Sequence, residues 1–468
     1  MTRTVLAAIA VAFALLGVPS VATAQSGDIA GRLEAIPGMT VLEERPAPAP
    51  YRFFVLSYVQ PADHQNPLKG SFEQRLTLLH KDADRPMVLH TTGYNVRISP
   101  TRSEPARLVD GNQISVEQRF FTPSQPDPAD WSTLNIWQAA TDHHRLVDAL
   151  DDVYPGRWLS TGASKGGMTS VYHRRFYPHD VDGTVAYVAP NDVVNAEDSA
   201  YTEFFDQVGS PECRAALTAL EREALGPRRA ALRERFAATA ATEGWTFERT
   251  IGTVDRALEM VVLDTAWAFW QYSGEAACAG VPAPTASTDD IYGFLDAVVS
   301  FGFYTDQGLE PYIPYYFQAG TQLGYPVPSF DRLEGLLRYR GLYQPRSVVP
   351  RELPMRFEPQ RMPDVDRWVK QRGSELLFVY GENDPWGAEA FELGRGTLDS
   401  YWYEAAGANH GATIAALTPA EQAEAMAAVQ RWAGLEPPRT ARAAAPRVAA
   451  LDSYNEALDH RSATTPLR

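Results

Sequence analysis

The stretch that decides the fold is W-L-S-T-G-A-S-K-G-G, residues 158–167. Its first four residues favour a strand, and a helical pattern follows it. Between the two, Gly162 and Gly166 stand two positions on either side of Ser164, which gives the pattern G-x-S-x-G. Small residues allow a strand and a helix to meet in a sharp turn that exposes the serine hydroxyl. A plain glycine-rich turn would give the same pattern, so the interpretation depends on the rest of the chain.

Two later residues have the positions that partners of a nucleophilic serine require. In folds with this turn, an acid and then a histidine follow the serine at the ends of later strands. Asp384 lies in the loop after an apolar run at 375–380. His410 follows another strand-like run, and the only later histidine, His460, lies in the presumed tail. The sequence therefore predicts Ser164, Asp384 and His410 as a catalytic triad.

The expected roles follow from acyl-transfer chemistry. His410 would remove the proton of Ser164 and later donate it to the leaving group, while Asp384 would fix the imidazole tautomer. Glu382 is an alternative acid in the same loop. We favour Asp384 because it lies deeper in the loop, where Pro385 can hold the backbone.

The negative charge of a tetrahedral intermediate needs two N–H donors. One would come from Lys165, the residue after the nucleophile, and the other from the loop that follows an earlier strand. That loop is 90–95, where we expect the Tyr94 amide, although other amides of the loop are alternatives. The side chain of Lys165 is expected to point away from the reacting centre.

Strand-like runs alternate with helical patterns, which predicts a largely parallel sheet. The runs lie at 53–59, 72–79, 87–90, 113–121, 158–161, 185–189, 376–380 and 401–403, and the clearest helical patterns at 134–150 and 168–177. From about residue 191 to 364 the strand pattern is replaced by Arg/Glu/Ala-rich helical stretches. We predict an α/β-hydrolase fold with a mostly parallel central sheet and a large, mainly helical cap inserted between the two halves of the core.

These patterns divide the chain into six parts. They are a signal peptide (1–24), an N-terminal lead-in (25–50), the first part of the α/β-hydrolase core (51–190), the helical cap (191–364), the second part of the core (365–435) and a flexible tail (436–468). The signal peptide is indicated by a charged start, a short apolar run at 5–18 and the small residues at 22–24. It predicts a secreted, extracellular protein, and an uncleaved membrane anchor is the alternative.

Composition narrows the classes of partner. The 468 residues include 42 basic and 58 acidic side chains, a formal charge of -16, so there is no electrostatic case for binding nucleic acid or an anionic membrane. Neither His143 with His144 nor His173 with His179 comes with carboxylates at metalloprotease spacing. We expect no metal, no cofactor and a monomer.

Cysteine is represented only by Cys213 and Cys278. An exported protein meets an oxidising compartment, which favours a disulfide between them. Two buried free thiols are the alternative, because sequence alone does not show that the two residues meet in space.

Four motifs resemble the secreted prolyl tri/tetrapeptidyl aminopeptidases of Streptomyces, the PS-10 peptidase family. The motifs are GASKGGMT (162–169), YVAPNDV (187–193), GENDPW (381–386) and GANHG (407–411). The resemblance extends from about residue 45 to 434, including the cap and both cysteines. It implies an α/β-hydrolase exopeptidase that releases tripeptides or tetrapeptides from free N-termini and favours proline at the cleaved position.

An enzyme of this kind has to bind a proline ring and a substrate ammonium group. Aromatic walls suit the proline, and Trp386 and the cluster at 267–272 offer them, although core packing explains most of that cluster equally well. Carboxylates in a partly desolvated site suit the ammonium. Glu197 and Asp198, where the cap begins, are the expected pair, and complementing a helix dipole is the alternative role for them.

Two other functions use the same sequence features. A secreted carboxylester hydrolase would need the same triad, and only its substrates would differ. A non-catalytic binding protein on a hydrolase scaffold would explain the fold but not the three filled catalytic positions.

Overall fold

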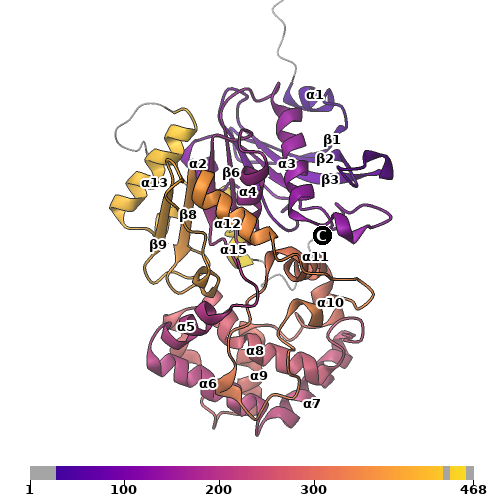
Figure 1. Cartoon of the computed structure of the whole chain (residues 1–468), viewed down its shortest axis with the longest axis vertical. Coiled ribbons are helices and arrows are strands. Elements are labelled where there is room, and N and C mark those ends of the chain that lie inside the picture. Colours follow the sequence, from indigo (N-terminus) through magenta and orange to yellow (C-terminus); the bar gives the residue numbers. More distant parts are fainter. Residues whose placement is uncertain (1–27, 436–442, 460–468) are drawn as a thin grey trace, which may run out of the picture.

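The computed structural model describes residues 28–435 and 443–459, so the predicted signal peptide at 1–24 lies outside the described residues (Figure 1). Within them, nine strands form one sheet in the order β1-β2-β3-β5-β4-β6-β7-β8-β9. Neighbouring strands run parallel from β5 across β4 to β9, whereas β1, β2 and β3 pair antiparallel. The strands are β1 (Met39–Arg45), β2 (Arg52–Pro61), β3 (Ser71–His80), β4 (Met87–Thr91), β5 (Asn112–Val116), β6 (Trp158–Ala163), β7 (Gly183–Tyr187), β8 (Leu376–Gly381) and β9 (Tyr401–Ala405).

Helices cover both faces of the sheet, because its parallel strands carry apolar side chains on both faces. Along β8, Leu377 and Val379 join one apolar cluster and Phe378 and Tyr380 join another on the opposite face. The helices of these two clusters are α2 (Glu104–Leu108) and α13 (Pro419–Trp432) on the first face, and α3 (Ile136–Leu150), α4 (Lys165–Phe176) and α12 (Arg361–Arg372) on the second. This layering confirms the predicted α/β class with a mostly parallel sheet.

The strand predictions differ from the structure at the N-terminal edge. All eight predicted runs contain a strand, although the run at 113–121 is a strand only as far as Val116. The predicted lead-in at 25–50 is wrong, because α1 (Ile29–Glu34) and β1 both belong to the core. In β1 only Met39 is buried, and Glu43 and Glu44 are exposed. An edge strand of this composition lacks the apolar alternation by which the other strands were predicted.

The chain between β7 and β8 is helical and contains no strand; the part at 191–360 is called the inserted region below (Figure 1). Its helices are α5 (Ser199–Gln207), α6 (Pro211–Leu225), α7 (Arg229–Glu243), α8 (Val254–Tyr272), α9 (Thr288–Val298), α10 (Asp306–Leu309) and α11 (Ile313–Gln318). Residues 257–271 of α8 are all buried, so the aromatic cluster at 267–272 is largely core. The predicted boundary at residue 364 is wrong, because it falls inside α12, whose Val365 and Val369 pack in the core. None of the described helices is long and apolar enough to cross a membrane.

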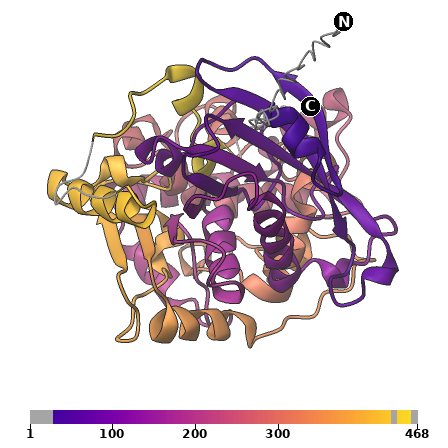
Figure 2. The same cartoon turned by 90° about the horizontal axis from the view of Figure 1, so that it is seen from above.

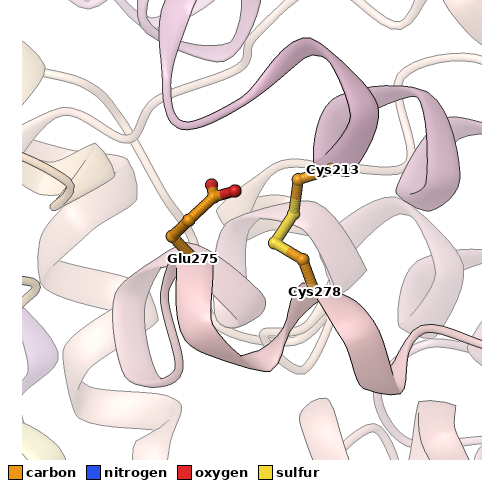
Figure 3. A group of neighbouring side chains, drawn as sticks. All are labelled: Cys213, Glu275 and Cys278. Atoms are coloured by element: carbon orange, nitrogen blue, oxygen red, sulfur yellow. A yellow bond between two sulfur atoms is a disulfide. The ribbon is translucent and has the colours of Figure 1, made fainter.

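The predicted disulfide is confirmed. Cys213 in α6 is bonded to Cys278, with the two Cα atoms 5.4 Å apart (Figure 3). Glu275 lies beside the bond, but its carboxylate accepts the N–H of Ser210 at 3.0 Å, and bonded sulfurs are not thiolate ligands. The bond therefore ties α6 to the segment after α8 and is not a metal site.

The prediction of a flexible tail is wrong for residues 443–459, which return to the N-terminal half of the sheet, in yellow in Figure 2. Leu451 is buried with Tyr51 and Phe53. Asp452 accepts two hydrogen bonds from the buried Arg102, at 2.8 and 2.6 Å. The Pro/Ala/Arg-rich composition concealed this packing, since only a few side chains make the contacts.

The ion pair of Arg102 with Asp452 gives a test of this docking. Removing one partner of a buried pair leaves an uncompensated charge, so Asp452→Ala is expected to lower the free energy of unfolding by about 3–5 kcal/mol. Asp289→Ala, in an exposed pair with Arg235, is the control and should cost less than about 1 kcal/mol. Urea unfolding of both variants measures the difference, and equal small losses would contradict a structural role for the docked segment.

Candidate active site

The predicted turn between β6 and α4 has the geometry of a nucleophile elbow. Ser164 has φ 55° and ψ -127°, a left-handed conformation that costs a non-glycine residue about 1–3 kcal/mol. The turn is held by the N–H of Ser164, which donates to the Tyr187 carbonyl on β7 at 2.9 Å. A Cβ at Gly162 would lie 2.4 Å from the backbone of Gly166, and one at Gly166 would lie 2.4 Å from the Thr91 carbonyl oxygen. Only glycine fits these two positions, which is why the sequence pattern required them.

The structure brings the predicted acid and histidine together. The Nδ1 of His410 lies 2.7 Å from Oδ2 of Asp384, and both side chains are fully buried. The other carboxylate oxygen accepts the N–H of Trp386 at 3.1 Å, which fixes the carboxylate in its plane. An ionised Asp384 accepts the proton on Nδ1, which leaves Nε2 as the basic nitrogen of the ring. That Nε2 is buried and has no hydrogen-bond partner among the described residues.

Glu382, the alternative acid, has a different role. Its side chain is exposed, and its carboxylate accepts the N–H of Gly407 at 2.7 Å. Asp384 is therefore the carboxylate of this loop that contacts His410.

A pocket opens where these elements meet. Its lining residues come from the elbow, from the loops after β7 and β8 and from the inserted region: Ser164, Lys165, Met168, Pro190, Asp192, Tyr201, Tyr315, Leu323, Gly324, Pro326 and Trp386. Trp386 borders the histidine as well, since its ring centroid lies 6.3 Å from that of His410. The predicted substrate-binding residue Trp386 thus shares a pocket with Ser164 and lies near His410.

Comparison with known proteins gives the family. The family model for PS-10 peptidase S37 matches residues 22–466. The chain belongs to this family. The prolyl tri/tetrapeptidyl aminopeptidase of Streptomyces mobaraensis is 54% identical over 452 residues, covering 95% of this chain and 94% of that protein. The predicted resemblance, the α/β-hydrolase fold and the serine-type peptidase class are confirmed.

Two solved structures illustrate a distant similarity. Proline iminopeptidase from Mycobacterium smegmatis is 15% identical with a TM-score of 0.35, covering 81% of this chain and 99% of that one. Epoxide hydrolase A from Mycobacterium thermoresistibile is 14% identical with a TM-score of 0.33, covering 77% and 94%.

Of the residues predicted to form the oxyanion hole, Lys165 directly follows Ser164, and Tyr94 lies in the loop that contacts the Lys165 side chain. Lys165 is the first residue of α4, where amide N–H groups lack acceptors within the helix. The N–H of Tyr94 donates to Oγ1 of Thr92 at 3.2 Å. Tyr94 would have to leave that acceptor to bind an oxyanion, so its role stays a prediction.

The predicted carboxylates of the ammonium site, Glu197 and Asp198, are not among the described residues that line this pocket. Glu197 is exposed and accepts the N–H of Ser199 at 3.1 Å, whereas Asp198 is half-buried and accepts the N–H of Val327 at 2.9 Å. Sequence reasoning missed two other acids: Asp192, which lines the pocket, and Glu389, whose charge acts on Asp192. Asp192 follows β7 at the same edge of the sheet as Asp384 follows β8, a signal that could have identified it. Glu389 has no comparable signal.

The side chain of Lys165 is buried in the wall of the pocket. Its Nζ donates to the Gly93 carbonyl at 2.6 Å and lies 5.6 Å from the ring centres of Tyr94 and Phe121. Burial lowers the pKa of Lys165 to about 7. The side chain thus turns toward the predicted oxyanion loop and holds its backbone.

This pKa predicts how Lys165→Met changes stability with pH. The unfolded chain keeps the lysine proton up to about pH 10.5, whereas the folded protein loses it near pH 7, so the cost of burial is full below pH 7 and declines above it. Relative to wild type, Lys165→Met should gain about 3 kcal/mol more in free energy of unfolding at about pH 6 than at about pH 9.

Urea unfolding at both pH values measures this difference. Lys69→Met is the control, because Lys69 is exposed and acids raise its pKa, so both of its states stay protonated over this range. A Lys165→Met effect that does not change with pH would contradict the assignment.

Proposed function

We propose that this chain is a secreted serine exopeptidase that releases tripeptides or tetrapeptides from free N-termini, cutting after proline. The observation that carries the proposal is the buried pair of Asp384 and His410. The ring of Trp386 lies 6.3 Å from that of His410, and Trp386 also lines the pocket that contains Ser164. The name of the Streptomyces mobaraensis relative supports the substrate class. The disulfide and the sequence at 1–24 are consistent with export.

The chemistry assigned to these residues is acyl transfer in two steps. His410 Nε2 takes the proton of Ser164 Oγ as the oxygen attacks the scissile carbonyl, and the resulting imidazolium is stabilised by Asp384. The amide of Lys165, at the start of α4, would donate to the oxyanion. His410 then gives its proton to the leaving amine, and the C–N bond breaks to leave an acyl-enzyme. A water molecule, activated by the same Nε2, hydrolyses that ester and releases the N-terminal peptide.

The walls of the pocket favour an apolar, ring-shaped side chain. Pro190, Tyr201, Tyr315, Pro326 and Trp386 present rigid aromatic and aliphatic surface near Ser164. A proline ring packs well against such surfaces and leaves no N–H unsatisfied. This composition supports proline on the acyl side of the cleaved bond.

The acid assignment can be tested within one loop. Asp384→Asn keeps the shape of the side chain but no longer fixes the required tautomer, so kcat should fall about 10⁴-fold. Glu382→Gln, two residues away, should change kcat less than about threefold, because its carboxylate only holds the exposed Gly407 amide. A chromogenic Ala-Ala-Pro anilide measures both variants. A larger loss in Glu382→Gln would overturn the assignment.

The reaction class can be tested by the products. Incubated with a synthetic peptide that begins Ala-Ala-Pro, the enzyme should release Ala-Ala-Pro and no internal fragments, as read by mass spectrometry, and Ser164→Ala should release nothing. The competing function, a carboxylester hydrolase, predicts the opposite preference. A short nitrophenyl ester that is cleaved rapidly while the peptide stays intact would establish the esterase.

A further inference from the structure

Asp192 is a buried acid whose carboxylate lacks a partner among the described residues. Its side chain is 4% exposed, and neither carboxylate oxygen has a hydrogen-bond partner among the described residues. The same side chain lines the pocket that contains Ser164. A buried carboxylate is normally paired or hydrogen-bonded, because its desolvation is otherwise uncompensated. An unpartnered one beside the nucleophile indicates that its partner arrives with the substrate.

The surroundings of Asp192 are acidic. Burial and the nearby carboxylates of Glu389 and Asp198 raise the pKa of Asp192 to about 8, and the nearby Tyr325 amide lowers it only in part. Burial, with Asp198 and Glu197, raises the pKa of Glu389 to about 7. None of the ion pairs among the described residues includes any of these four acids. The described part of the chain therefore pairs no cation with this cluster.

The pocket also constrains where a cation can bind. Gly324, with φ +81°, lies against Asp192, and a Cβ there would come within 2.4 Å of Oδ2. The hydroxyl of Tyr201 and Nε1 of Trp386, two further residues of this pocket, are also buried and have no hydrogen-bond partner in the described part of the chain. An acceptor for a cation thus lies beside two donors suited to peptide carbonyls. These groups complement an N-terminal peptide unit, which presents an ammonium donor and carbonyl acceptors.

We propose that Asp192, assisted by Glu389, is the receptor for the ammonium group of the substrate's N-terminal residue. The inference rests on the proposed peptidase function and deepens it. Asp192 shares its pocket with Ser164, so holding the amine there limits how many residues fit between the N-terminus and the cleaved bond. Glu197, predicted from sequence for this role, is exposed and accepts the N–H of Ser199. It is therefore not assigned to the receptor.

The test uses two substrates that differ only in the charge. Ala-Ala-Pro p-nitroanilide carries the ammonium group, and propionyl-Ala-Pro p-nitroanilide has a hydrogen in its place. In Asp192→Asn, the ratio of kcat/KM for the first to kcat/KM for the second should fall about 10- to 100-fold, because a charge-assisted hydrogen bond is lost. The rate with the propionyl substrate should fall by a clearly smaller factor.

Two further variants separate this role from a general effect on the pocket. Glu389→Gln should lower the ratio in the same direction by a smaller factor, and it keeps the test available if Asp192→Asn does not fold. Glu203→Gln is the matched control, since Glu203 is an exposed acid of α5 that accepts a hydrogen bond from Gln207. The ratio of the two kcat/KM values should not change in this variant. An unchanged ratio in Asp192→Asn, or an equal loss on both substrates, would overturn the proposal.

Binding separates failure of this inference from failure of the proposed function. Calorimetry with Ser164→Ala should show tighter binding of Ala-Ala-Pro than of propionyl-Ala-Pro, and Asp192→Asn in that background should remove the difference. Equal affinities would overturn the ammonium site even where wild type cleaves peptides. Wild-type protein that cleaves no peptide would refute the proposed function, while the two affinities would still decide the role of Asp192.

Discussion

The close backbone contact between the elbow and the loop after β4 is the constraint on which the site depends. Gly93, Gly162 and Gly166 bring two backbone segments so close that a Cβ at any of them would meet backbone atoms within 2.7 Å. The contact is reinforced by Oγ1 of Thr91, which donates to the Gly166 carbonyl at 2.8 Å, and by Lys165. This packing keeps Ser164 in its costly left-handed conformation. Local strain of this kind persists only where the surroundings determine it completely.

How much of this could be predicted depended on the range of the interactions. The elbow and the strands from β2 to β9 are local patterns, so the sequence indicated them. The order of serine, acid and histidine can be read along the chain in the same way. Choosing between Asp384 and Glu382 needed the direction of each side chain, which one loop does not reveal. β1 was missed because only Met39 of this edge strand is buried, which leaves no apolar alternation. Residues 443–459 were missed because they are fixed by partners far away in the chain, such as Arg102 for Asp452.

The acids near the pocket show the same limit. Glu197 and Asp198 were expected to bind the ammonium group because they begin the inserted region. The structure instead buries Asp192, against which Gly324 of one segment packs, and the carboxylate of Glu389 from another segment raises its pKa. Residues 319–323, just before Gly324, form a π-helical turn, a departure from the α-helix that is frequent at functional sites. Three separate parts of the chain thus create an environment that none of them indicates alone.

The pocket contains a lysine, Lys165, and an aspartate, Asp192, that do not form an ion pair with each other. Lys165 donates to a backbone carbonyl and Asp192 has no donor, and no ion pair between the described residues joins them. Burial moves the two pKa values toward each other, to about 7 and about 8, so near neutral pH both groups can be uncharged. An uncharged pocket can admit the apolar parts of a substrate. An arriving ammonium ion favours the charged form of Asp192, which then releases its proton. Lys165 has a structural role in holding Gly93, whereas a buried carboxylate without a partner only costs stability, so the reason for Asp192 has to be sought in the substrate.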